Sequence, residues 1–127
     1  MKDIQDIDDI KIFVDQFYLK VREDELIGPI FLDKITDWQP HLNKMYAFWN
    51  AALFGIPGFV GNPFAKHAPL KIEAPHFERW LYLFNQTIDH YFEGEVALDA
   101  KNRGQLMAKM FLSRMQNMAT NPNKVIV

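Results

Sequence analysis

The chain of 127 residues contains no cysteine. This absence excludes a disulfide framework, a thiol nucleophile, an iron–sulfur cluster and covalent attachment of haem. Among side chains that commonly bind transition metals, it leaves chiefly the four histidines. Serine is also scarce, because Ser113 is the only one, and it lies in a helical pattern without a matched His and Asp. A serine hydrolase is therefore not expected.

The chain also lacks a large charge of either sign and any long hydrophobic run. Lys and Arg total 14 and Asp and Glu total 16, so the net charge of −2 provides no general attraction to nucleic acid or anionic membrane. No apolar run approaches the roughly 18 residues of a membrane span, and the acidic residues 1–9 lack the apolar core of a signal peptide. We expect a cytoplasmic protein that binds neither nucleic acid nor membrane.

Two motifs of known chemistries are incomplete in this sequence. Gly55, Gly58 and Gly61 miss the spacing of both the phosphate-binding loop and the dinucleotide fingerprint, and no Lys-Ser or Lys-Thr follows them. Glu73 and His76 have the spacing of di-iron carboxylate bundles, but a proline interrupts them and no second copy exists. We assign neither activity.

Aromatic residues are abundant, with 11 Phe, 4 Tyr and 3 Trp, and 6 Met are added to them. This is more apolar volume than a plain helical bundle of this size requires, and a flat apolar ligand would use the surplus. The length predicts a single domain over residues 1–127, with its core from about residue 10 to 118 and frayed termini.

Apolar residues recur at helical spacing through most of the chain, which predicts an all-α fold. The first stripe consists of Ile10, Phe13, Val14, Phe17, Tyr18 and Val21. This helix is expected to end at Gly28, in a left-handed cap that precedes Pro29, and a short connector is expected to begin at Phe31.

Three further helices are expected. One starts at Thr36 and Asp37, whose side chain should cap it, and ends at Gly55. Another starts near Pro75 and carries its last inward residue, Tyr91, before Gly94. The last carries Met107, Met110, Phe111, Met115 and Met118 before a frayed tail at 120–123.

His67 lies in the one stretch that cannot form a long helix, residues 55–69. Loops present functional groups against a rigid scaffold, and neutral imidazole is a common metal ligand. Tyr18, His41, Met45 and Trp80 lie on apolar faces of other segments. Taken singly, each has a structural explanation, as a loop histidine, a helix-end histidine or a core aromatic. Their convergence would place several polar groups in one core, which indicates a bound cofactor.

These residues carry a resemblance to a known family. Phe17-Tyr18, Trp38-Gln39-Pro40-His41 and the segment from Gly61 to His67 resemble the motifs of truncated haemoglobins, most closely those of group III. Trp80 follows His67 by 80 − 67 = 13 residues, which is the His-to-Trp spacing of that family. His76 and His90 lie outside these motifs, and we expect both to be solvated.

The resemblance implies a two-over-two helical sandwich around a non-covalent haem b. His67 would be the proximal iron ligand, and Tyr18, His41 and Trp80 would donate hydrogen bonds to a distal ligand. The remaining contacts to haem would come from Phe31, Leu42, Met45, Phe59, Phe64, Leu70, Ile72, Phe77, Trp80 and Leu81, with Lys66 and Lys44 near the propionates.

The implied function is binding of the diatomic gases O2, NO and CO. Several donors around O2 would slow its release, which favours redox chemistry of O2, nitric oxide or peroxide, supported by an unidentified reductase. Oxygen storage or sensing is an alternative. A cofactor-free helical interaction domain is a third hypothesis, from a different class of protein.

Overall fold

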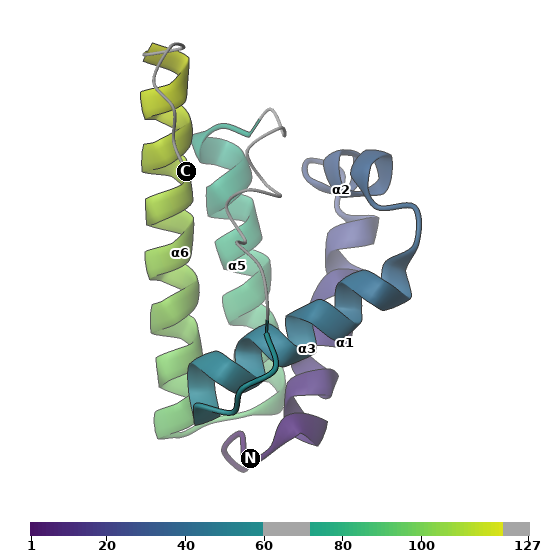
Figure 1. Cartoon of the computed structure of the whole chain (residues 1–127), viewed down its shortest axis with the longest axis vertical. Helices are drawn as coiled ribbons and strands as arrows, with labels where there is room; N and C mark the ends of the chain where they lie inside the picture. Colours follow the sequence, from purple (N-terminus) through teal and green to yellow (C-terminus); the bar gives the residue numbers. More distant parts are fainter. Residues whose placement is uncertain (60–71, 121–127) are drawn as a thin grey trace.

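The computed structural model describes residues 1–59 and 72–120, with side chains described as far as residue 117. Within this part of the chain there are helices and no strand (Figure 1), so the all-α prediction is confirmed. None of these helices is long and apolar enough to cross a membrane. The helices are α1 (Ile7–Glu23), α2 (Gly28–Lys34), α3 (Trp38–Phe54), α5 (Ala74–Tyr91) and α6 (Glu95–Thr120).

The helices form two packed pairs. In Figure 1, α5 and α6 run side by side, and α3 crosses α1. Contacts of α1 with α5 and of α3 with α6 join the two pairs, while α2 packs against α1. This arrangement is the two-over-two sandwich that the sequence led us to expect.

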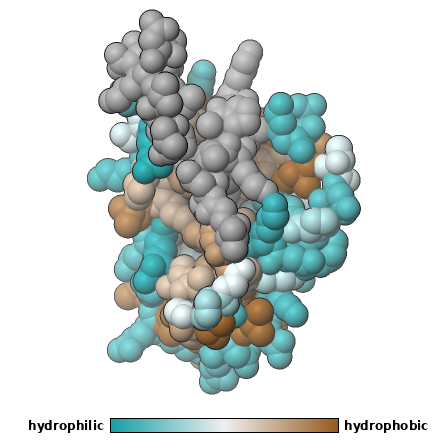
Figure 2. Space-filling model, in the orientation of Figure 1, coloured by the Kyte–Doolittle hydropathy of each residue, from teal (hydrophilic) through white to brown (hydrophobic). Residues whose placement is uncertain are grey.

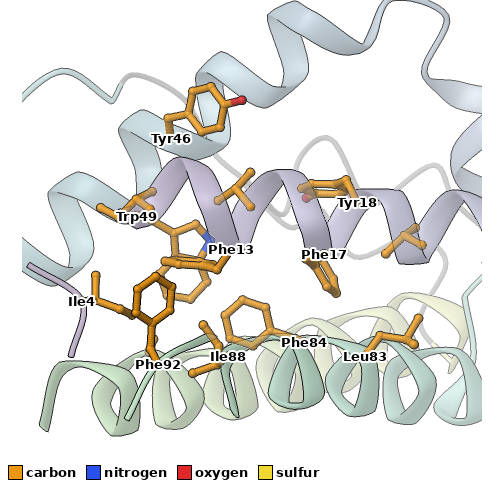
Figure 3. Close-up of a cluster of buried hydrophobic side chains, with 14 of the residues drawn as sticks. Ile4, Phe13, Phe17, Tyr18, Tyr46, Trp49, Leu83, Phe84, Ile88 and Phe92 are labelled. Carbon is orange, nitrogen blue, oxygen red and sulfur yellow. The ribbon is translucent and has the colours of Figure 1, made fainter. Parts of the chain in front are cut away.

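The core forms where α1 faces α5. Every residue of the predicted α1 stripe is buried, which confirms that part of the sequence interpretation. Phe13 and Phe17 point from α1 toward Phe84 and Ile88 on α5 (Figure 3). Burying each such side chain contributes on the order of 2 kcal/mol. The core also begins earlier than residue 10, because Ile4 is only 2% exposed.

Asp3 attaches the N-terminal segment to α6. Its carboxylate accepts hydrogen bonds from the backbone N–H groups of Val96 at 2.9 Å and Ala97 at 2.8 Å. These groups belong to the first turn of α6, so Asp3 does the work of an N-cap although it is remote in sequence. Gly94 has φ of 134°, and a Cβ atom there would lie 2.5 Å from the Asp3 carboxylate. Glycine is therefore required beside this contact.

The junction of α1 and α2 differs from the prediction. Helix α1 ends at Glu23, five residues before Gly28, because the Asp24 side chain accepts hydrogen bonds from the N–H groups of Leu26 at 3.1 Å and Ile27 at 3.0 Å. These bonds replace the next helical turn with a tight corner.

Gly28 is the first residue of α2 and does not adopt the left-handed conformation that we predicted. Glycine is needed there because a Cβ atom would lie 2.9 Å from the carbonyl oxygens of Val21 and Arg22. The expected connector at Phe31 is also wrong, since this residue lies inside α2 and is buried. Pro29 sits in the first turn, where its missing N–H costs nothing.

Other helix boundaries agree more closely with the sequence. Helix α3 ends at Gly55, as predicted, and this glycine has the left-handed conformation, with φ of 66°. Asp37 is the N-cap residue of α3, but its side chain makes no capping hydrogen bond, in contrast to the prediction. Helix α5 ends at Tyr91, which was the last inward residue expected before Gly94. Met110 of α6 is 42% exposed and does not belong to the core.

An ion pair between Asp24 and Arg79 joins the corner of α1 and α2 to α5. Nε of Arg79 lies 2.6 Å from Oδ1 of Asp24, whose side chain is 3% exposed. Burial would raise the pKa of the Asp24 carboxyl, but the hydrogen bonds from Ile27, Arg79 and Leu26 and the charge of Arg79 lower it overall. The carboxylate is thus held ionised by the folded structure.

Asp24→Asn should lower the free energy of unfolding by about 2 kcal/mol at neutral pH, because the amide loses the charge and presents an N–H2 group to existing donors. Since the folded-state pKa of Asp24 lies below its unfolded value, its stabilisation is complete above that unfolded value, about 3.9. It is lost as the pH falls through the lowered pKa. Urea unfolding of both proteins at several pH values should show the difference shrinking below about pH 4.

The matched control is Asp33→Asn, because Asp33 is an exposed carboxylate 4.0 Å from Lys34. Its effect should stay within about 0.5 kcal/mol. An equal loss in both variants, or an Asp24 effect that persists unchanged in acid, would contradict this role for the ion pair.

Candidate functional site

An apolar cavity lies among the helices and is partly open to solvent; the space between its lining residues, including the open part, is about 760 Å³. Figure 2 shows the face of the molecule that is seen in Figure 1. Around the edge of that face most of the described residues are hydrophilic, and hydrophobic residues are visible between them. The cavity is lined by Val14, Phe17, Tyr18, Phe31, Met45, Phe48, Trp49, Ile72, His76, Phe77, Trp80, Phe84, Met107, Ala108 and Phe111.

Tyr18 is a polar group in this lining, and α1 places it there through the buried stripe. It is 6% exposed, and its ring is packed edge-on against Phe17 at 5.0 Å and Phe31 at 6.3 Å between ring centroids. Burial raises the pKa of the Tyr18 hydroxyl above its usual range. The hydroxyl therefore stays protonated and can donate a hydrogen bond to a molecule in the cavity.

His41 lies directly against Tyr18. The two ring centroids are 5.0 Å apart, at an angle of 82°, and the Nε2 atom of His41 is buried. Trp38 stands edge-on to His41 at 5.8 Å and tilted to Tyr18 at 5.8 Å. The guanidinium of Arg22 lies 3.9 Å from the centre of the Trp38 ring, a cation–π contact. The structure thus brings Tyr18 and His41 together, although His41 is not among the residues that line the cavity.

Trp80 forms part of a row of stacked rings. Its ring is stacked on Phe84 at 5.3 Å and 5°, and Phe84 is stacked on Trp49 at 5.1 Å and 16°. Phe17 meets Trp80 edge-on at 5.3 Å and Phe84 edge-on at 5.4 Å. We call Trp49, Phe84 and Trp80 the aromatic row. It gives the cavity a flat, rigid wall made by α3 and α5.

The other residues predicted to contact a cofactor fall into three sets. Phe31, Met45, Ile72, Phe77 and Trp80 line the cavity. Four residues lie outside the lining. Leu42 packs against the core, and the ring centroid of Phe59 lies 5.3 Å from that of Phe48. Leu81 is half-buried and Lys44 is exposed. Outside the described residues lie Phe64, Lys66, His67 and Leu70, so the proximal ligand stays a prediction.

The sequence interpretation missed His76 as a lining residue. We expected it to be solvated, but it is half-buried and lines the cavity at the start of α5. Its Nδ1 atom accepts a hydrogen bond from the backbone N–H of Glu73 at 2.9 Å. One pattern could have identified it, because His76, Trp80 and Phe84 are spaced four residues apart and therefore share a helical face. His90, by contrast, is exposed as expected.

Helix α6 supplies a second set of lining residues that we had not assigned to the site. Met107, Ala108 and Phe111 close the cavity on that side. The four-residue step from Met107 to Phe111 is visible in the sequence, but it does not by itself tell a plain core stripe from a cavity wall.

The lining has the chemistry of a site for a flat apolar molecule. Its walls are aromatic or aliphatic, and its polar groups are few: they include Tyr18 on α1 and His76 and the indole of Trp80 on α5. Such a site binds by apolar contact and orients its ligand through the polar groups. Within the described part of the chain, no cluster of His, Asp and Glu side chains is placed to hold a bare metal ion.

Comparisons with known proteins agree with this geometry. The family model described as bacterial-like globin matches residues 4–120. Group 3 truncated hemoglobin ctb of Campylobacter jejuni is 36% identical over 107 residues, which cover 80% of this chain and 81% of that protein. Group 1 truncated hemoglobin GlbN of a Nostoc species is 33% identical over 70 residues, 54% of this chain and 58% of that protein.

A solved structure extends the similarity to the backbone. The crystal structure of a group III truncated hemoglobin from Campylobacter jejuni matches with a TM-score of 0.83 and 31% identity. The match covers 91% of this chain and 95% of that one.

Gly104→Ala tests how tightly the aromatic row is held. An added Cβ atom would lie 3.0 Å from Cδ2 and Cε2 of Phe84, which is held between Trp49 and Trp80 and cannot yield without disturbing a stack. Alanine gains up to about 1 kcal/mol of helix propensity over glycine, but overpacking costs about 1–3 kcal/mol. We expect a net loss of about 1 kcal/mol in urea unfolding.

The control is the same substitution in a Phe84→Leu background, where the ring is absent. There Gly104→Ala should be neutral or stabilising, and the double-mutant cycle should show this coupling. If Gly104→Ala stabilises the protein with Phe84 intact, the row is more compliant than we infer.

Proposed function

Because the chain belongs to the bacterial-like globin family, we propose that it binds haem b non-covalently in the apolar cavity and uses it to bind diatomic gases. The observation that carries the proposal is the buried, protonated Tyr18 hydroxyl in an otherwise mostly apolar cavity, with His41 beside it. A flat apolar ring fits the aromatic walls. Haem, when bound, supplies an iron atom that takes a diatomic gas as ligand.

We assign the proximal position to His67. The support is its position in the sequence, in the glycine- and proline-rich stretch before α5 and 13 residues before Trp80 (80 − 67), a spacing that resembles that of the family. A neutral imidazole on one side of the ring leaves the opposite side for a gas. The described residues offer a distal set, Tyr18, His41 and Trp80, from three different helices.

The role of the distal set follows from charge. O2 gains negative charge when it is held in such a site, and a donor in a dry pocket stabilises that charge without having to reorganise. CO gains little charge and responds less. Tyr18 is the best placed donor, since it is buried, protonated and in the cavity lining.

We further propose that the protein performs redox chemistry of O2, nitric oxide or peroxide. Several donors around one ligand slow its release, and slow release suits reaction in place better than transport. Turnover of this kind needs electrons, so a reductase is the partner we expect. Oxygen storage or sensing is the alternative, and it would need neither a reductase nor fast reaction with nitric oxide.

The first test of this function is Tyr18→Phe, which removes one oxygen atom and leaves the volume nearly unchanged. If the hydroxyl contributes about 1.5–3 kcal/mol to holding O2, its dissociation should accelerate roughly 10- to 100-fold. CO dissociation should change far less. Stopped-flow release of both gases from the two proteins measures this directly.

Tyr46→Phe is the matched control. Tyr46 is also a buried tyrosine, but its hydroxyl donates to Asp15 outside the cavity lining, and burial together with Asp15 raises its pKa to about 12. Its loss should leave both gas release rates within about twofold while removing a hydrogen bond worth about 1 kcal/mol of stability. Unchanged O2 release in Tyr18→Phe would move the donor role to His41 or Trp80.

The second test concerns the iron ligand. His67→Ala should abolish the normal axial coordination and most haem retention, which the visible spectra of the ferric, ferrous and CO-bound forms would report. His90→Ala, at an exposed position of α5, should leave all three spectra unchanged. If the His67→Ala protein had normal spectra, another residue would bind the iron, and the assignment of His67 as the proximal ligand would be wrong.

A further inference from the structure

His76 presents an imidazole to the cavity from the first turn of α5. It begins the face of α5 that continues with Trp80 and Phe84, so the imidazole stands at one end of the aromatic row. Tyr18 reaches the cavity from α1, a different helix. The mostly apolar lining thus receives its Tyr18 hydroxyl from α1 and its His76 imidazole from α5.

The hydrogen bond at Nδ1 fixes what this imidazole can do. Nδ1 accepts from the backbone N–H of Glu73 at 2.9 Å, so it carries no proton. In a neutral imidazole the proton must then be on Nε2. A protonated Nε2 has no lone pair to give to a metal, and so His76 is built as a hydrogen-bond donor and not as an iron ligand.

His76 is half-buried, and a ligand that fills the cavity would displace water from its Nε2 donor. The donor then needs an acceptor on the ligand, because a polar group left buried without one is costly. Haem has two kinds of acceptor, a gas on the iron and the carboxylates of its two propionates at the ring edge. In the proposed site, Tyr18 and its neighbour His41 already supply hydrogen-bond donors for the gas. An ionised carboxylate is also the stronger acceptor of the two.

We propose that Nε2 of His76 donates a hydrogen bond to a propionate carboxylate of the bound haem, which anchors one edge of the ring at the start of α5. This inference rests on the proposed function, since it presupposes haem in the cavity. It adds a residue that determines the orientation and retention of haem, and it gives His76 a role different from that of the iron ligand.

Two substitutions separate this role from helix capping. His76→Glu keeps a side-chain oxygen that can accept from the Glu73 N–H, as glutamate does at this position of a capping box, but it has no donor and brings a negative charge. His76→Gln keeps an acceptor and also carries an amide donor. We expect haem loss to a scavenger protein to be about 10- to 100-fold faster in His76→Glu, and within about threefold of the wild type in His76→Gln.

The chemical probe is an iron porphyrin with ethyl groups in place of both propionates. Without a carboxylate there is nothing for His76 to bind, so the wild type and His76→Glu should release this porphyrin at similar rates. His90→Glu adds the same charge at an exposed position of α5 and should release natural haem as the wild type does.

Three results would overturn the proposal. Haem loss at the wild-type rate in His76→Glu would mean that His76 serves the helix start alone. Equal acceleration with the carboxyl-free porphyrin would mean that the substitution acts through the structure. Faster O2 release with unchanged haem retention would make the gas the acceptor. If the wild type takes up haem but the His76 variants show none of the expected differences from it, only this inference is refuted. If the wild type shows no haem spectrum, the proposed function is refuted as well.

Discussion

The stacking of Phe84 between Trp49 and Trp80 is the contact on which the rest of the structure depends. It joins α3 to α5, it receives the edge of Phe17 from α1, and it leaves little room for a side chain larger than glycine at Gly104, where α6 passes. A ring packed against two indoles and the edge of Phe17 has little room to change rotamer, and it fixes the helices around it in position. The same contact forms one wall of the cavity. Core packing and site geometry are in this way a single property, and a change that loosens one also changes the other.

The sequence was sufficient to predict which residues are buried where an apolar stripe marks one face of a helix. The stripe from Ile10 to Val21 is buried as a whole, and several such stripes predicted the all-α fold, whereas the two-over-two sandwich was implied by the family resemblance. It failed at the corner after α1, because Gly28 has two uses that look alike in a sequence. A glycine after an apolar stripe is typical of a left-handed cap, but here it permits close approach to the carbonyl oxygens of Val21 and Arg22. Only the position of the neighbouring turn distinguishes the two cases, and that position is set by the side chain of Asp24.

The candidate site shows the same division. The position of Tyr18 and Trp80 in the cavity lining could be predicted, since each lies on an apolar stripe and also belongs to a motif that resembles the family. His76 was dismissed because a histidine at the start of a helix is usually solvated. Its hydrogen bond with Glu73 is local, but its exposure to the cavity depends on how α5 packs against α1 and α6, which no local pattern contains. Met107, Ala108 and Phe111 are similar, because an apolar stripe on a helix reads the same whether it faces a core or a ligand.

The attachment of Asp3 to the first turn of α6 also has a consequence for how the chain folds. The two hydrogen bonds join residues 93 and 94 positions apart. A ribosome makes Asp3 long before its partners Val96 and Ala97, so these two hydrogen bonds cannot form until the start of α6 has emerged. Such long-range closure slows folding and couples the beginning of the chain to α6 in one cooperative step. The segment before α1 is thus completed late, although it is synthesised early.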